Sequence, residues 1–196
     1  MITGARYWQD RSRYYTQTNN SIEGLLKKFG GRWLETCGPT VAAMCIDMIG
    51  YPTVISTPGS YKPQPEDVLT LCMNDPRNAE VMKQIRSGVE AFPGNRVPQY
   101  YPWAVRVVFG ASSVFVMPLS WVTLTDEIKC GSAIQICRKE PGHYLAAVAF
   151  DDVTRELIYH DPWPEGQPDG QGFAKRIKED QWRDQFNAWG VVYETR

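Results

Sequence analysis

The chain has 196 residues, 43% of them hydrophobic, and a formal net charge of -1 at pH 7. This length suffices for one well-buried core, so we expect a single domain over residues 1–196. The near-zero charge gives no sign of a nucleic-acid partner, and no stretch approaches the roughly 20 consecutive apolar residues that cross a membrane.

The N-terminal part is polar and aromatic. The opening "MITGARYWQDRSRYYTQTNN" has no apolar core of a signal peptide, so we expect a protein that is cytoplasmic as synthesised. Residues 1–34 read as an extended arm with one or two turns, including a short helical segment at "SIEGLLKKF" that Gly30 and Gly31 end.

The stretch "CGPTVAAMCIDMIG" predicts a buried helix that begins at Cys37. Apolar residues follow this cysteine at offsets of 4, 7, 8 and 11, which is the spacing of one helix face, and Gly50 with Pro52 ends the pattern. The thiol therefore lies in the first turn of a helix.

Residues 51–120 are expected to form a helical insertion or lobe. After a loop over 51–62, "PEDVLTLCMN" and "RNAEVMKQIRSGVEAF" predict two helices, whereas "YYPWAVRVVFGASSVFVMP" fits either a helix or a strand. The following "SWVTLTDEIKCG" has the capping residues and closing glycine of a short helix.

The pattern becomes typical of a sheet after Gly131. We expect strands at "SAIQICR", "HYLAAVAF" and "ELIYH", a helix at "IKEDQWRDQFNAW" and a last strand at "GVVYE". The turn "DDVTR" predicts antiparallel pairing of the second and third strands. Helices followed by a sheet indicate an α+β fold of two lobes, a helical N-terminal one and a C-terminal antiparallel sheet.

The cysteines give one candidate nucleophile. Their odd number, five, and the absence of a Cys-x-x-Cys pair or a zinc-type Cys/His spacing argue for free thiols, without a structural metal or other cofactor. Four of them fit the role of small buried apolar residues. Cys37 differs, because unpaired backbone N–H groups and the helix dipole at a helix N-terminus favour thiolate over thiol.

A nucleophilic cysteine needs a base, and the chain has only two histidines, His143 and His160. Adjacent strand residues point to opposite faces, so His160 and Asp161 cannot both face one site, and His160 is expected to pack on the other face. If the strands 143–150 and 156–161 form a hairpin, His143 and Asp161 meet at one end of it. The alternatives are an exposed turn histidine and an Asp-Pro turn.

Three ordered motifs resemble the papain-like cysteine peptidases, in the branch related to bacteriocin-processing (double-glycine leader) peptidases. They are "CGPTVAAMCIDMIG", "GHYLAAVAFDD" and "YHDPW". The well-matched part covers about residues 33–50 and 121–193, and the segment 51–120 resembles no family that we can name.

The resemblance implies that Cys37 is the nucleophile, that His143 is the general base and acid, and that Asp161 orients the imidazole. Members of the family place a glutamine upstream of the cysteine as an oxyanion donor. The six residues before Cys37 contain none; the upstream "YYTQTNN" makes Gln17 the candidate, with Gln9 as its rival.

The expected activity is hydrolysis of a peptide or isopeptide bond, in a protein or a peptidoglycan stem peptide, by a phage-derived enzyme that acts in the cytoplasm or after release on lysis. Two alternatives stay open. One is an acyl transferase that uses the same three residues, and the other is a catalytically inactive binding module of papain-like shape, such as a phage factor that sequesters a host protein. The substrate's identity and the oligomeric state are not predicted.

Overall fold

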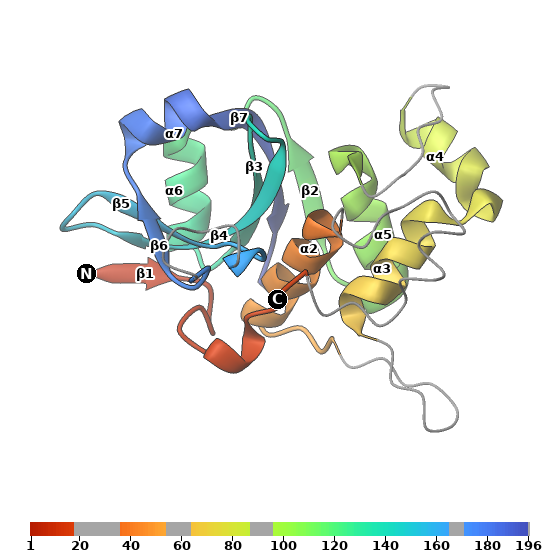
Figure 1. Cartoon of the computed structure of the whole chain (residues 1–196), viewed down its shortest axis with the longest axis horizontal. Coiled ribbons are helices and arrows are strands. Elements are labelled where there is room, and N and C mark those ends of the chain that lie inside the picture. Colours follow the sequence, from red (N-terminus) through yellow and green to blue (C-terminus); the bar gives the residue numbers. More distant parts are fainter. Residues whose placement is uncertain (18–35, 54–63, 87–95, 165–170, 196) are drawn as a thin grey trace.

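The computed structural model describes residues 1–17, 36–53, 64–86, 96–164 and 171–195. A sheet with its own helices lies on one side of a central helix, α2, and further helices lie on the other (Figure 1). The predicted α+β class is confirmed. The helix predicted at "SIEGLLKKF" and most of the loop predicted over 51–62 lie outside the described residues.

The sheet has seven strands in the order β2-β7-β3-β4-β5-β6, with β1 beside β4, and neighbouring strands are antiparallel. The strands are β1 (Ile2–Gly4), β2 (Ser113–Val116), β3 (Ala133–Arg138), β4 (His143–Asp151), β5 (Glu156–His160), β6 (Lys175–Ile177) and β7 (Phe186–Tyr193). The predicted β4–β5 hairpin is confirmed. Part of the N-terminal arm is also in the sheet, because β1 pairs with the end of β4 beyond the residues that β3 pairs.

The helices of the described residues are α2 (Cys37–Met48), α3 (Pro65–Asn74), α4 (Ala79–Ile85), α5 (Tyr101–Phe109), α6 (Trp121–Lys129) and α7 (Glu179–Gln185), with three short 3-10 turns at Arg11–Arg13, Pro76–Asn78 and Pro98–Tyr100. Helix α6 begins as its sequence predicts, since the Ser120 hydroxyl accepts a hydrogen bond of 3.0 Å from the Thr123 amide. Over the described ranges, none of the helices has the length and hydropathy needed to cross a bilayer.

Helix α2 packs against one face of the sheet and α6 against the other. Successive residues of β4 therefore alternate between two cores: Ala146 and Val148 belong to the core with α2, and Leu145 and Ala147 to the core with α6. Helices α3 and α5 pack beyond α2. Because α2 is enclosed between them and the sheet, it is apolar on nearly all sides rather than on one stripe.

The sequence "YYPWAVRVVFGASSVFVMP" fits either a helix or a strand, and the structure contains a helix followed by a strand there. Helix α5 ends where Gly110 adopts φ +68°, a left-handed conformation that suits glycine, and β2 follows at Ser113. Strand β2 then pairs with β7, so the chain passes from α5 directly into the sheet.

The C-terminal helix is shorter than predicted. We expected it to extend over "IKEDQWRDQFNAW", but α7 ends at Gln185 and β7 begins at Phe186. Phe186 stacks on Trp182 with 4.9 Å between ring centroids and pairs with Arg138 of β3. Pairing with a distant strand outweighs the local helical pattern here. Strand β6 was not predicted, because three residues carry little periodicity.

Candidate active site

Helix α2 begins at Cys37, whose side chain is partly exposed. The preceding Thr36 does not cap the helix with its side chain; its hydroxyl instead donates to the Gln17 carbonyl oxygen at 3.5 Å. Pro39 has no N–H in the first turn, where amides have no intrahelical partner. The thiol thus stands at the positive end of a buried helix, as predicted.

His143 and Asp161 lie in direct contact, 2.7 Å apart between Nε2 and Oδ1. His143 is the first residue of β4, and Asp161 directly follows β5. Since His160 pairs with Ala146, the residue after it lies toward the start of β4, which brings the carboxylate to the imidazole.

The Cys37 side chain also lies close enough to the imidazole to affect its pKa. Burial alone would lower the pKa of His143, but the hydrogen bond to the Asp161 carboxylate and the proximity of Cys37 raise it from 6.5 to about 9. Because Nε2 faces the carboxylate, Nδ1 is the ring nitrogen left for the thiol. The structure therefore brings together all three of the residues predicted to react.

Asp161 is held by its backbone as well as by its side chain. Its amide donates to the Gly172 carbonyl at 2.7 Å, and its carbonyl accepts 2.6 Å from the Tyr14 hydroxyl. The Trp163 amide donates to Oδ1 at 2.9 Å, so this oxygen serves both the imidazole and the chain two residues on. Sequence reasoning missed Tyr14 and Gly172, because no local pattern places them beside an Asp-Pro turn.

The two candidate glutamines lie in different environments. Gln17 is 2% exposed. Its backbone amide donates to the Pro162 carbonyl at 2.9 Å, and its backbone carbonyl accepts the hydrogen bond from the Thr36 hydroxyl. It is thus fixed between the residue before Cys37 and the residue after Asp161. Gln9 is exposed and lines a surface hollow with residues 6–10. Of the two, Gln17 is the one beside the thiol-bearing helix.

His160 is fully buried and lies outside the group formed by Cys37, His143 and Asp161. Its Nε2 donates to the Trp8 carbonyl at 3.1 Å, its Nδ1 accepts 2.9 Å from the Ala174 amide, and its ring stacks on Phe173 at 4.4 Å. Burial lowers its pKa from 6.5 to about 4. The histidine packs and bonds as a neutral structural group, in agreement with the predicted alternation.

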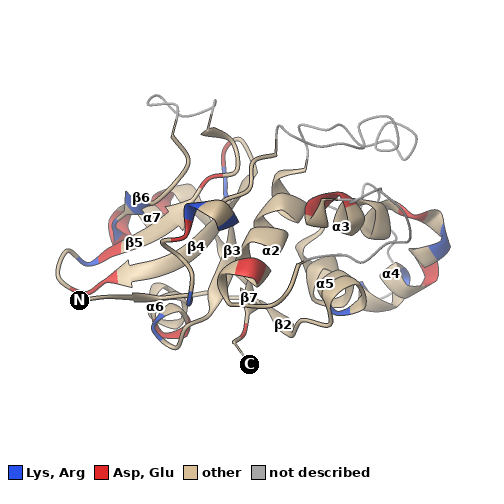
Figure 2. Ribbon diagram, turned by 90° about the horizontal axis from the view of Figure 1, so that it is seen from below, with Lys and Arg blue, Asp and Glu red and all other residues tan. Residues whose placement is uncertain are grey.

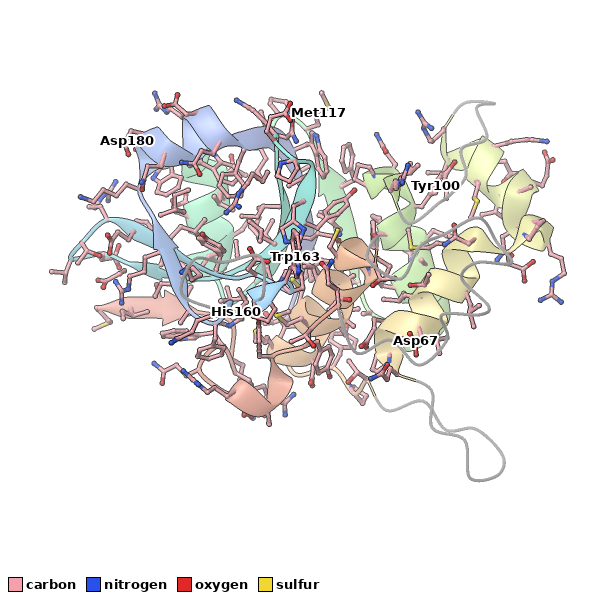
Figure 3. All side chains as sticks on the ribbon, in the orientation of Figure 1. Asp67, Tyr100, Met117, His160, Trp163 and Asp180 are labelled. Atoms are coloured by element: carbon pink, nitrogen blue, oxygen red, sulfur yellow. The ribbon has the colours of Figure 1, made fainter. Side chains whose placement is uncertain are left out.

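A cavity of about 440 Å³ opens beside Cys37. Its other lining residues come from the ends of β3, β4 and β7 and from the chain before α5: Arg96, Cys137, Pro141, Gly142, Tyr144 and Trp189. Trp163, 38% exposed, places its ring edge-on to His143 with 6.2 Å between centroids, and in the view of Figure 3 it lies where the sheet meets α2. The thiol is therefore accessible from a hollow whose lining includes the aromatic rings of Tyr144 and Trp189.

The other cysteines are poor nucleophiles or lie apart from this cavity. Burial raises the pKa of Cys45 strongly, and that of Cys72 and Cys137 to about 11, so these thiols stay protonated near neutral pH. Cys130 is exposed at the end of α6. All five cysteines are free.

The charged side chains are mixed in sign. Figure 2 shows basic and acidic residues interspersed around β5, β6 and α7 and again around α3 and α4. A surface hollow of about 560 Å³ at α7 is lined by both signs, including Lys178, Asp180 and Arg183. Within the described ranges, no three His, Cys, Asp or Glu side chains are grouped so that they could hold a metal ion.

Comparison with known proteins gives a consistent result. Residues 10–188 match the model of a family described as Peptidase_C39 like. Among solved structures, a C39-like peptidase from Bacillus anthracis superposes with a TM-score of 0.52 at 12% identity, over 93% of this chain and 94% of that one. The peptidase domain of Streptococcus mutans ComA also matches, with a TM-score of 0.39 at 12% identity over 72% of this chain and 98% of that one. No curated protein sequence matches.

Proposed function

Because the chain belongs to the Peptidase_C39 like family, as its three motifs predicted, we propose that it is a cysteine peptidase whose reaction is carried by Cys37, His143 and Asp161. The family indicates peptidase activity and a peptide or protein substrate. The observation that carries the assignment of residues is the position of the His143 imidazole, between the Cys37 thiol and the Asp161 carboxylate.

In the proposed mechanism, the Cys37 thiolate attacks the carbonyl carbon of the scissile amide. The His143 imidazolium gives its proton to the leaving amine as the tetrahedral intermediate collapses to a thioester. His143, now neutral, takes a proton from water, which hydrolyses the thioester and restores the thiolate. Asp161 keeps Nδ1 directed at the thiol throughout and stabilises the imidazolium.

The oxyanion of the tetrahedral intermediate needs preorganised donors. We assign this role to the backbone N–H of Cys37, at the helix N-terminus, and to the side-chain amide of Gln17. What supports Gln17 is its fixed, buried position beside Thr36. Gln9, by contrast, is exposed.

We further propose that the bond lies in a protein or in a peptidoglycan stem peptide, and that the enzyme is of phage origin and acts in the cytoplasm or after lysis. The support is the resemblance of the motifs, and the cavity beside Cys37 provides room for a substrate side chain. The same three residues could pass the acyl group to an amine instead of water.

The first test needs no substrate. The rate of alkylation by iodoacetamide is measured for each cysteine between pH 5 and 8, by mass spectrometry, in the wild type and in His143→Ala, with the exposed Cys130 as the internal reference thiol. We expect Cys37 to react at least about tenfold faster than Cys130 at pH 6, and we expect His143→Ala to abolish this excess.

An unexceptional rate at Cys37 in the folded wild type would reject the catalytic proposal and favour a binding module. If the rate is high, peptide libraries and purified peptidoglycan are screened for cleavage, with Cys37→Ala as the control. Adding a primary amine to the reaction then separates peptidase from acyl transferase, since only the transferase converts the acyl group mainly to the new amide.

A further inference from the structure

A glutamine in the sheet contacts the helix that carries the thiol. Gln135, in the middle of β3, is 0% exposed and faces the core with α2. Its Nε2 donates to the Gly38 carbonyl oxygen at 3.3 Å, and its Oε1 accepts 2.7 Å from the Tyr193 hydroxyl. A primary amide is costly to bury, and here both its ends are satisfied.

These contacts connect the two elements that supply the reacting groups. Gly38 directly follows Cys37 in the first turn of α2. Gln135 pairs with Ala146 on β4, the strand that begins at His143. The amide of Gln135 thus joins the backbone next to the thiol to the sheet that holds the imidazole.

Helix α2 and strands β3 and β4 also share an apolar core, to which the helix contributes small residues such as Ala42 and Ala43. Apolar packing is non-directional, so it opposes a shift of the helix along the sheet only weakly. A hydrogen bond to one particular carbonyl fixes the position along the strand. Tyr193, on the neighbouring β7, in turn restricts the rotamer of Gln135.

We propose that Gln135 is a positioning residue that fixes the separation of Cys37 and His143 by holding the Gly38 carbonyl. This inference rests on the proposed function, because it concerns the same thiol and imidazole. Gln135 itself touches neither of them and takes no part in proton transfer.

The test compares two variants that differ only at residue 135. One is the single variant Tyr193→Phe, and the other is the double variant that carries Tyr193→Phe together with Gln135→Met. The double variant removes the amide together with its hydroxyl partner, so that the partner is not left unsatisfied, and Met has nearly the same length as Gln. The pH profile of Cys37 alkylation is measured relative to Cys130, together with the melting temperature. Ile136→Ala, on the same strand but facing α6, serves as a destabilised control.

We expect the double variant to lose about tenfold or more of the Cys37 rate at pH 6 and to shift its profile to higher pH, because small displacements between reacting groups are costly. Tyr193→Phe should retain most of the rate, and Ile136→Ala should lose stability but keep the profile. A double variant with the profile of Tyr193→Phe would overturn the inference.

Should the double variant fail to give a native near-UV circular dichroism spectrum, Gln135→Asn decides, since its neutral amide is one methylene shorter and cannot reach the Gly38 carbonyl and the Tyr193 hydroxyl together. An unchanged profile in that variant would likewise overturn the inference. Failure of the proposed function looks different, because Cys37 of the wild type itself would then react no faster than Cys130.

Discussion

The two histidines experience opposite environments. The hydrogen bond to the Asp161 carboxylate and the proximity of Cys37 outweigh burial and raise the pKa of His143 to about 9, whereas burial lowers that of His160 to about 4. His143 therefore stabilises the folded protein below its ordinary pKa of 6.5, an effect lost as the pH rises through 9. His160 stabilises it above 6.5, and about 3 kcal/mol is lost as the pH falls through 4.

We predict that the two imidazoles are resolved in an NMR titration of histidine-labelled protein. One signal should titrate near pH 9, and the other should stay neutral down to about pH 4. His143→Ala assigns the first signal by removing it. Two signals that both titrate near pH 6.5 would contradict the ion pair as well as the burial of His160.

The placement of the three proposed catalytic residues could be predicted from the sequence because each is specified locally. Cys37 opens a recognisable helix, and with only two histidines in the chain the alternation of strand side chains was enough to prefer His143. Tyr14 and Gln135 could not be found in this way. Each acts through a contact with a residue about a hundred positions or more away, Asp161 and Gly38 respectively, and neither sits in a motif.

At the scale of elements, the segment that follows β5 approaches Asp161 closely at Gly172. A Cβ atom on Gly172 would overlap the Asp161 carbonyl oxygen and the Tyr14 hydroxyl. Only glycine allows this approach, and the approach carries the hydrogen bond from the Asp161 amide to the Gly172 carbonyl.

We predict that Gly172→Ala displaces Asp161 and slows alkylation of Cys37 at pH 6 by about tenfold, through the loss of imidazole orientation. The overlap should also cost about 1–3 kcal/mol of stability, measured by thermal denaturation. Gln171→Ala, at the exposed neighbouring position, is the control and should change neither quantity appreciably. An unchanged Cys37 rate in Gly172→Ala would show that Asp161 does not depend on this contact.

Elements with local periodicity were predicted well, and elements defined by their partners were not. Helix α3 and the β4–β5 hairpin have the predicted positions, since capping residues, turn residues and alternation specify them. The start of β7 was wrong because "FNAW" continues a helical pattern and becomes a strand only by pairing with β3. Strand β6 exists only as the neighbour of β5.

At the scale of the whole molecule, the helical part and the sheet share chain elements. Helix α5 leads into β2, β2 pairs with β7, and α2 is enclosed between α3 and the sheet. We propose on these grounds that residues 1–196 form one domain, and we predict a single cooperative unfolding transition.

Calorimetric and van't Hoff enthalpies should agree, and unfolding curves from tryptophan fluorescence and far-UV circular dichroism should coincide. The tryptophans suit this test because Trp103 lies in α5 whereas Trp121 and Trp182 lie in the core with α6. Two separate transitions would show that the segment over residues 51–120 is an independent unit.

The place of β7 in the sheet has a consequence for the timing of activity. This strand is the last described in the chain, yet it lies inside the sheet, between β2 at the edge and β3. A nascent chain can form α2 and the β4–β5 hairpin, but Gln135 meets Tyr193 only after residue 193 has left the ribosome. Because this strand pairing is long-range, the sheet that positions His143 is completed only after β7 has been synthesised. The high reactivity proposed for Cys37 should therefore appear only once β7 has joined the sheet.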